Sequence, residues 1–206
     1  MEAAFGRPPR ADGEVTFLPP LPNGMSAVVA FVAHHVVAAD IDDTVARSRL
    51  SPGDVGAPMS PAFLLFLAGW VGAEPGMLDV VLAATDPTPI EPSGLWIRDD
   101  LGDHPRVQRA LRFRPQATVY ADRPSGEPDG VLVVGEGVAG RWEMAFEVAP
   151  HARGNGIGRR FAAAATALVP HGEPLFAQVT PGNVASLRAF LAAGYVPVGA
   201  EVLFAP

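Results

Sequence analysis

The stretch from Glu147 to Leu168 constrains the fold of this chain more than any other part of its sequence. It begins at the end of an apolar run, residues 142–148, that is typical of a β-strand. From about Gly156 its apolar residues recur every three or four positions, as in a helix that faces a core. The turn between strand and helix, residues 153–158, contains three glycines, which allow a sharp bend and the close approach of a ligand. A helix that begins there points unpaired N–H groups outward, so the turn predicts a site for pyrophosphate or another anion.

The glycine-rich turns of two common nucleotide-binding folds fit this sequence less well. Its spacing is GxGxG, whereas dinucleotide-binding folds carry GxGxxG. A P-loop is excluded because the chain contains no lysine. Glycines that only shorten the connection, or an unrelated nucleotide-binding domain, remain as alternatives. Arg153, Arg159 and Arg160 favour an anion site because they add fixed positive charge around the turn.

A second group of signals follows further along the chain. Residues 175–179 form a short apolar run that predicts a strand. Asn183 is a good N-cap for a helix over residues 184–193, and Gly194 suits the position after a helix. Residues 200–204 predict a last strand.

The two regions together resemble the GNAT superfamily of N-acetyltransferases. The pattern R-x-x-G-x-G after a strand is similar to the loop that binds the coenzyme A pyrophosphate in that family. Asn183, Ser186 and the pair Gly194-Tyr195 are spaced as in its C-terminal half. The resemblance begins at about Ala117 and reaches the C-terminus. It implies an α/β (α+β) fold, the GNAT fold, whose mixed central sheet is flanked by helices and whose fourth and fifth strands splay apart.

The same resemblance implies the activity and its co-substrate. A primary amine would attack acetyl-CoA directly in a ternary complex, and no metal would take part. The backbone of Val148 would bind the pantetheine amides as an added strand would, and Asn183 with the following helix would line the pantetheine and cysteamine. The residues that the resemblance assigns to acetyl-CoA are Phe146, Val148, Arg153, Gly154, Asn155, Gly156, Ile157, Gly158, Arg159, Asn183, Ser186 and Phe190.

The chain departs from the family at the usual acid and base positions. Phe190 stands where many members have a tyrosine that protonates the leaving thiolate. The positions at which members carry a base are Trp142, Met144 and Gln178, none of which titrates usefully. A non-catalytic acyl-CoA sensor or regulatory protein with a GNAT fold therefore remains the alternative to an enzyme.

Two carboxylates on the strand at residues 142–148, Glu143 and Glu147, are the candidates for the catalytic base. Strand alternation places both on the face opposite Phe146. A β-bulge, common in this strand of the family, would be needed to turn one into the site. The alternative is a structural ion pair with an arginine such as Arg188 or Arg109.

The N-terminal half carries fewer signals. Residues 1–23 are rich in proline and predict a loose tail with a short extended segment near Val15–Leu18. Residues 24–206 predict a single GNAT-like domain, with a substrate-side part over 24–115 and an acetyl-CoA-binding core over 116–206. The other expected elements are a strand or hairpin over 26–39, for which a helix is the alternative, helices over 42–50, 61–72 and 104–113, strands over 77–84, 117–121 and 130–138, and a loop over 86–103.

Composition limits the partners. The net charge of −7 disfavours nucleic acid and anionic membranes and favours cationic substrates such as amines. The absence of cysteine, of a signal-peptide pattern and of a run of about twenty apolar residues predicts a cytoplasmic protein. His34 and His35 are not expected to bind one metal ion, because neighbours in a strand point to opposite faces. The acceptor amine and the acyl chain length stay open, as does a homodimer.

Overall fold

The computed structural model describes residues 1–22, 24–85 and 94–205, and the chain forms two compact units. Unit 1 consists of Leu82–Pro197 with Met1 and Ala3–Phe5, and unit 2 consists of Gly6–Val81 and Val198–Pro206 with Glu2. The boundaries of these units differ from the division at residues 23 and 115 that the sequence suggested. Strand β5 (Asp79–Ala84) spans the boundary at residue 81, and a short 3-10 helix, η1 (Glu2–Phe5), begins the chain.

Unit 1 is built on a sheet of mixed polarity. Four strands pair antiparallel in the order β6-β7-β8-β9, and β10 pairs parallel to β9. This confirms the prediction of a mixed sheet. The strands are β6 (Trp96–Ile97), β7 (Thr118–Ala121), β8 (Gly130–Glu136), β9 (Trp142–Val148) and β10 (Leu175–Val179).

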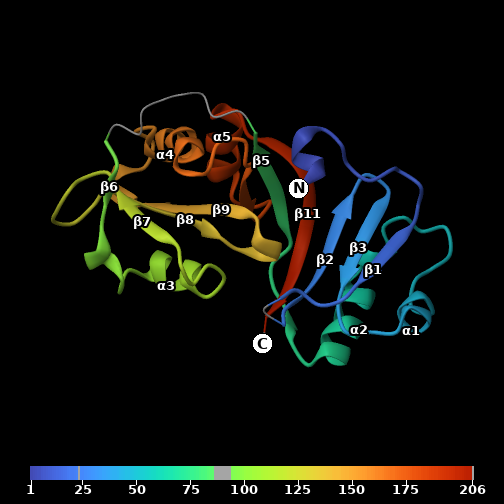
Figure 1. The fold of residues 1–206 in the computed structure, drawn as a ribbon. Helices are drawn as coiled ribbons and strands as arrows, with labels where there is room; N and C mark the ends of the chain where they lie inside the picture. Colours follow the sequence, from blue (N-terminus) through green and yellow to red (C-terminus); the bar gives the residue numbers. More distant parts are fainter. Residues whose placement is uncertain (23, 86–93, 206) are drawn as a thin grey trace. The chain divides into compact units, whose positions relative to one another are not determined.

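Helices cover both faces of this sheet (Figure 1). On one face α4 (Ile157–Ala165) and α5 (Val184–Ala192) pack against each other, and on the other lies α3 (Pro105–Leu111). Alternation along the strands matches the two faces. Phe146 of β9 contacts the aromatic rings of α4 and α5, whereas Val131 and Val133 of β8 pack against α3. Short 3-10 helices complete the unit: η3 (Asp99–Leu101), η4 (Val138–Gly140), η5 (Pro150–Ala152) and η6 (Thr166–Leu168).

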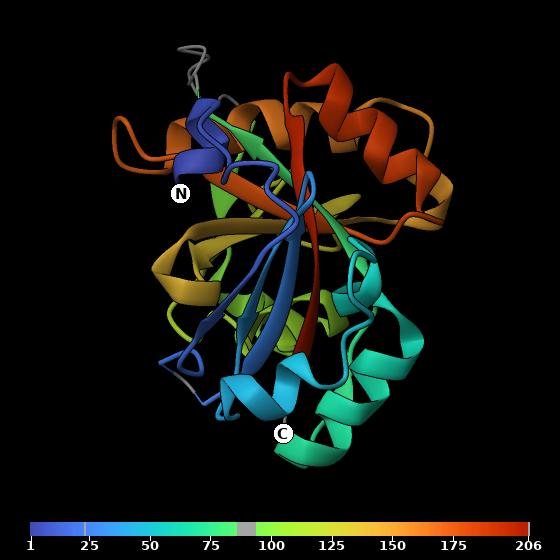
Figure 2. The same cartoon turned by 90° about the vertical axis from the view of Figure 1, so that its right-hand side faces the viewer.

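Unit 2 contains a second group of paired strands (Figure 2). The hairpin of β2 (Ser26–Phe31) and β3 (His34–Ala38) is joined by parallel β1 (Val15–Leu18) on the β3 side. On the β2 side lies antiparallel β11 (Val196–Ala205), whose end also pairs with β4 (Glu74–Pro75). The core of unit 2 forms where valines of this sheet meet Phe63 and Leu67 of α2 (Pro61–Val71). The remaining elements are α1 (Asp43–Arg47) and η2 (Ala57–Met59).

Local sequence signals explain the helices of unit 2. Ser60 caps α2 by accepting a hydrogen bond from the Phe63 N–H, and Pro61 occupies the first helical position. Gly72 ends the helix in the left-handed conformation, with φ of 68°. Asp42 caps α1 in the same way, by accepting hydrogen bonds from two N–H groups of its first turn. Helix α2 begins and ends close to the predicted residues, whereas α1 ends at Arg47, before the predicted end at residue 50.

Several elements differ from the expectations. The segment Val15–Leu18, expected within a loose tail, pairs with β3 along its whole length. The hairpin turns at residues 32–33, so both histidines lie in the second strand. The last strand begins at Val196, earlier than predicted, because neither Pro197 nor Gly199 interrupts it. In the predicted loop over 86–103, β6 and η3 form, and residues 86–93 lie outside the described residues. No helix within the described ranges has the length and apolarity of a membrane span.

Two carboxylates lie together in the interior of unit 2. Asp79 is half-buried at the start of β5, and Glu201 of β11 is buried. Burial, and after it the negative charge of Glu201, raises the pKa of Asp79 from its ordinary 3.8 to about 6. Because the folded-state pKa lies above the unfolded value, the contribution of Asp79 to stability is present at low pH and is lost as the pH rises through about 6.

We therefore expect Asp79→Asn to raise the thermal unfolding midpoint at pH 7 but to leave it nearly unchanged at pH 4. The amide stays neutral throughout, whereas the native carboxyl must ionise near Glu201. The control Asp40→Asn removes the same charge at an exposed position, and its effect should not grow across this pH range. Parallel curves for Asp79→Asn and the wild type between pH 4 and 7 would contradict the assignment.

Candidate functional site

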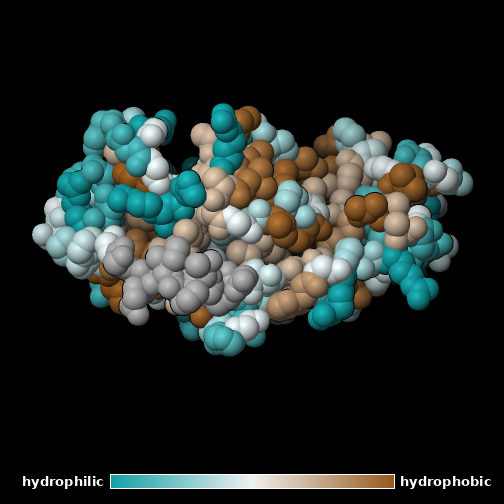
Figure 3. All heavy atoms as spheres, turned by 90° about the horizontal axis from the view of Figure 1, so that it is seen from above, coloured by the Kyte–Doolittle hydropathy of each residue, from teal (hydrophilic) through white to brown (hydrophobic). Residues whose placement is uncertain are grey.

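A cavity of about 1000 Å³ opens in unit 1 beside the glycine-rich turn. The end of β9, the first turn of α4 and one face of α5 form most of its wall, and α3 contributes one residue. In Figure 3, which looks down on α4 and α5, hydrophilic residues crowd the left-hand part of this face of unit 1. The wall residues are Arg106, Phe146, Glu147, Val148, Ala152, Arg153, Gly154, Gly156, Ile157, Gly158, Arg159, Asn183, Ala185, Ser186, Arg188, Ala189 and Ala192.

The cavity lies where the pairing of β9 and β10 has ended. The register joins these two strands through two residue pairs, Leu175–Trp142 and Phe176–Glu143. Past Glu143, the rest of β9 continues toward the glycine-rich turn while still paired with β8 on its other side. This is the arrangement predicted for strands that splay apart.

The glycine-rich turn exposes the N-terminus of α4. Gly154 and Gly156 have φ of 83° and 77°, in the left-handed region that glycine adopts without strain. No side chain in the described part of the chain caps this nine-residue helix at Gly156. A Cβ atom added at Gly154 or Gly156 would have no atom within 4 Å. The first N–H groups of α4 therefore face open space with the positive end of the helix dipole behind them.

The next glycine has a packing role. A Cβ atom at Gly158 would lie 2.9 Å from the ring of Phe146, so β9 can approach α4 only with glycine at this position. The centroid of the Phe146 ring lies 6.4 Å from the ring centroid of Phe161 and 5.2 Å from that of Phe190. These contacts fix the wall of the cavity against the sheet.

Positive charge dominates the cavity although the chain as a whole is acidic. Four arginines line it, Arg106, Arg153, Arg159 and Arg188, against one carboxylate, Glu147. The Arg153 Nε donates a hydrogen bond of 3.2 Å to the carbonyl of Val148, which holds the turn against the end of β9. A wall of this kind concentrates an anion at the N-terminus of α4.

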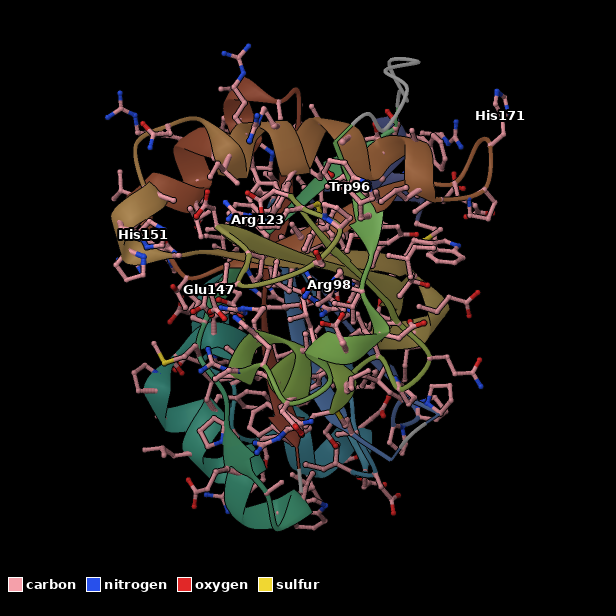
Figure 4. All side chains as sticks on the ribbon, turned by 90° about the vertical axis from the view of Figure 1, so that its left-hand side faces the viewer. Trp96, Arg98, Arg123, Glu147, His151 and His171 are labelled. Carbon is pink, nitrogen blue, oxygen red and sulfur yellow. The ribbon has the colours of Figure 1, made fainter. Side chains whose placement is uncertain are left out.

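Glu147 lies on the α3 side of β9. Its carboxylate forms an ion pair with Arg106 of α3, with 3.5 Å between Oε2 and Nε, and its side chain is 44% exposed. Figure 4 shows Glu147 on the same side of this view as His151, whereas His171 lies toward the opposite edge. Glu147 is thus the candidate base that reaches the cavity.

Glu143 is instead fully buried and is not part of the cavity wall. Its Oε2 accepts a hydrogen bond of 2.9 Å from Arg114. Its Oε1 accepts from Arg141 at 2.7 Å, from Gln178 at 2.8 Å and from the Val138 N–H at 3.2 Å.

The register and the neighbouring backbone explain this burial. The pairing of β8 with β9 runs unbroken from Gly130–Val148 to Glu136–Trp142, so no bulge turns Glu143 toward the cavity. A Cβ atom at Gly137 would overlap the Glu143 carboxylate. The ion pairs considered from the sequence exist, but they involve Arg114, Arg141 and Arg106 instead of Arg188 or Arg109.

Most residues assigned to acetyl-CoA share this cavity. Asn155 and Phe190 do not line it. Phe190 is buried between Phe146 and Tyr195, and the Tyr195 hydroxyl donates a hydrogen bond to the Ala162 carbonyl. Burial raises the pKa of Tyr195. The assigned residues in the wall are Phe146, Val148, Arg153, Gly154, Gly156, Ile157, Gly158, Arg159, Asn183 and Ser186.

Two arginines of the cavity wall, Arg106 and Arg188, were not assigned to the site from the sequence. Arg188 lies on α5 with Ala185, Ala189 and Ala192, whose spacing of three and four residues places them on one helix face, so this signal was available. No pattern in the sequence indicates Arg106, because α3 lies on the opposite face of the sheet from α4 and α5. Only the tertiary structure brings Arg106 to the cavity.

His34 has a local role in unit 2. Its Nδ1 lies 2.8 Å from Asp12 and its Nε2 lies 3.1 Å from the Thr16 hydroxyl, so it ties the segment before β1 to β3. Over the ranges that the structure describes, no group of three or more His, Asp or Glu side chains is placed to hold a metal ion.

Comparison with known proteins gives similarity to solved structures alone. No protein-family model matches the sequence, and no curated protein matches it. One similar structure is a protein from Novosphingobium aromaticivorans assigned to the GNAT family of acetyltransferases, with 16% identity, a TM-score of 0.48 and 64% of each chain covered.

Two more are an acetyltransferase from the GNAT family of Colwellia psychrerythraea and a GCN5-related N-acetyltransferase from Kribbella flavida. The first has 16% identity and a TM-score of 0.43 over 70% of this chain and 62% of the other. The second has 17% identity and a TM-score of 0.44 over 68% and 62%. The chain spans less than two-thirds of the length of these proteins. At this level of similarity, the function has to come from the geometry of the cavity.

The buried network around Glu143 yields a prediction. We expect Glu143→Gln to lower the free energy of unfolding by about 3–5 kcal/mol, because it leaves the Arg114 and Arg141 guanidinium groups without their shared buried carboxylate. The control Glu136→Gln makes the same change at an exposed position on β8 and should have a much smaller effect. Chemical denaturation measures both, and an equally small effect at Glu143 would show that the network does not stabilise unit 1.

Proposed function

We propose that this protein is an N-acetyltransferase that moves an acetyl group from acetyl-CoA to a primary amine in a ternary complex. The observation that carries the proposal is the uncapped N-terminus of α4, flanked by arginines, at the place where β9 and β10 have stopped pairing. A helix N-terminus with added guanidinium groups fits a pyrophosphate. The opening beside β9 fits an extended chain that pairs with strand backbone.

Different residues of the wall bind different parts of acetyl-CoA. The N–H groups at Gly154 and over residues 156–158, with Arg153 and Arg159, hold the pyrophosphate, and the backbone of β9 at Phe146 and Val148 orients the pantetheine. Asn183 and Ser186 approach it from α5. When bound, acetyl-CoA supplies an acetyl group activated as a thioester.

We assign the proton chemistry to Glu147. An amine must be neutral to attack, so a base has to accept its proton, and Glu147 is the one carboxylate in the cavity wall among the residues that the structure describes. Phe190 has no proton to donate. The Tyr195 hydroxyl is buried and hydrogen-bonded to the Ala162 carbonyl, so it does not protonate the leaving sulfur.

A non-catalytic acyl-CoA sensor is the second candidate function. The ion pair between Glu147 and Arg106 favours it, because an arginine at this distance holds the carboxylate and competes with a substrate ammonium group for it. Release of CoA from acetyl-CoA with a panel of amines separates the two, since a sensor binds without release. A cytoplasmic location and a homodimer stay predictions from the sequence.

The binding assignment predicts a contrast between two neighbouring arginines. Acetyl-CoA at a hundred times its Kd should stabilise the wild type by about 2.7 kcal/mol, visible as a rise in Tm. Arg159→Ala should weaken acetyl-CoA binding roughly tenfold, because a charge-assisted contact to phosphate is lost. Arg160→Ala is the matched control, since Arg160 is exposed on the same helix but does not line the cavity. Equal losses for both, or an equal rise in Tm with ATP or NAD, would contradict the site.

The catalytic assignment predicts loss of turnover without loss of binding. Glu147→Gln keeps the shape of the side chain but cannot accept a proton, so kcat should fall by roughly 10²–10⁴ while the Kd for acetyl-CoA changes little. Glu173→Gln removes an exposed carboxylate away from the cavity and should leave kcat unchanged. Unchanged turnover in Glu147→Gln would mean that the amine arrives already neutral.

A further inference from the structure

The cavity wall carries two opposite charges side by side on the α3 side of the sheet. Arg106 of α3 and Glu147 of β9 lie 3.5 Å apart, between Nε and Oε2. Their side chains are 24% and 44% exposed, so both meet the cavity while part of each is buried. Glu147 is the base of the proposed reaction, whereas the binding of acetyl-CoA described above makes no use of Arg106.

The positive charge of Arg106 is only partly compensated by the protein's own groups. Its Nε atom is buried, and the nearest acceptor, Glu147 Oε2 at 3.5 Å, lies too far away for a good hydrogen bond. Burial lowers the pKa of Arg106, the positive charge of Arg109 lowers it further, and Glu147 only partly opposes this. Arg114 adds positive charge nearby and already binds Glu143 and Gln178. A buried donor without a close partner is costly, so this position suits an anionic group that arrives with a ligand.

That anionic group is distinct from the pyrophosphate. Helices α3 and α4 lie on opposite faces of the sheet (Figure 1). The glycine-rich turn with Arg153 and Arg159 belongs to the α4 side of β9, whereas Arg106, which also lines the cavity, belongs to α3. The cavity wall therefore carries cationic groups from both sides of β9. Of these groups, Arg106 lies next to the base.

We propose that the acceptor is a free α-amino acid, whose carboxylate binds Arg106 and whose amino group lies at Glu147. This rests on the proposed acetyltransferase function. An α-amino acid carries its ammonium and carboxylate on one carbon atom, so its two charges have the close spacing of the Arg106–Glu147 pair. The planar guanidinium matches a carboxylate with two parallel hydrogen bonds. Binding replaces one long internal ion pair by two contacts to the ligand.

The transfer then balances in protons and bonds. Glu147 accepts one proton from the ammonium group, which leaves a neutral amine. The amine nitrogen forms a bond to the acetyl carbon as the bond from that carbon to sulfur breaks. The second proton lost by nitrogen ends on the departing thiolate, so the products are an N-acetyl amino acid and CoA.

The test uses the full chain with acetyl-CoA and the twenty common amino acids, followed by the best one, its carboxamide and its decarboxylated amine. We expect kcat/KM for the amino acid to exceed that for both analogues by about 10², because the analogues leave Arg106 unpaired. Arg106→Gln should raise KM for the amino acid at least about tenfold and abolish the preference over the carboxamide. Its Kd for acetyl-CoA should stay within about twofold of the wild type. Arg112→Gln, an exposed change on the end of the same helix, is the control and should keep the preference.

Each contrary result has a separate meaning. If the carboxamide or the amine is acetylated as well as the amino acid, the α-amino acid assignment fails while the acetyltransferase function stands. If Arg106→Gln weakens acetyl-CoA binding and leaves the preference intact, Arg106 binds a phosphate of the co-substrate and the assignment also fails. If acetyl-CoA binds but no amino acid is acetylated, the amino acids are titrated into the CoA complex by calorimetry. The absence of amino-acid binding in that titration overturns the assignment. Failure of acetyl-CoA itself to bind would instead overturn the proposed function.

Discussion

The opening in unit 1 depends on one buried carboxylate. Glu143 receives hydrogen bonds from Arg114, Arg141 and Gln178, which come from the end of α3, from the residue before β9 and from β10. It lies at the last residue pair that joins β9 to β10. A charge so deeply buried is tolerated only because several donors converge on it. The strands are therefore tied together at this point, and the cavity begins beyond it.

From that point on, the two faces of β9 take different roles. On one face, Phe146 packs against α4 and α5, and the absence of a side chain at Gly158 lets the strand come close to the helix. This places the N-terminus of α4 at the cavity. On the other face, Glu147 meets Arg106 of α3. Strand alternation thus separates Phe146, which packs against the helix whose N-terminus lines the cavity, from Glu147, the proposed base, although both residues belong to one short strand.

The local charge of the cavity differs from that of the whole protein. The chain carries a net charge of −7, yet four arginines and a single glutamate line the wall. An acidic surface around a cationic cavity disfavours long polyanions such as nucleic acid and still leaves a strong site for a small phosphate-bearing ligand. The charge balance that matters for function is the local one, and it is consistent with both acetyl-CoA and a group of mixed charge.

The sequence by itself determined the elements whose signals are local. The ends of the helix predicted over residues 61–72 and the glycine-rich turn depend on neighbours within a few residues, so composition and spacing were enough to predict them, whereas the mixed sheet was expected from the family resemblance. The tertiary structure decided which of two similar glutamates reaches the cavity.

Glu143 and Glu147 share one face of one strand, but Arg114 and Arg141 enclose the first and only Arg106 meets the second. Arg114 lies 29 residues before Glu143 in the chain, and Arg106 lies still further from Glu147. Such contacts form only when α3 packs on the sheet. No spacing within a strand can reveal them, because alternation fixes the face of a side chain but not the partners that the fold brings to that face.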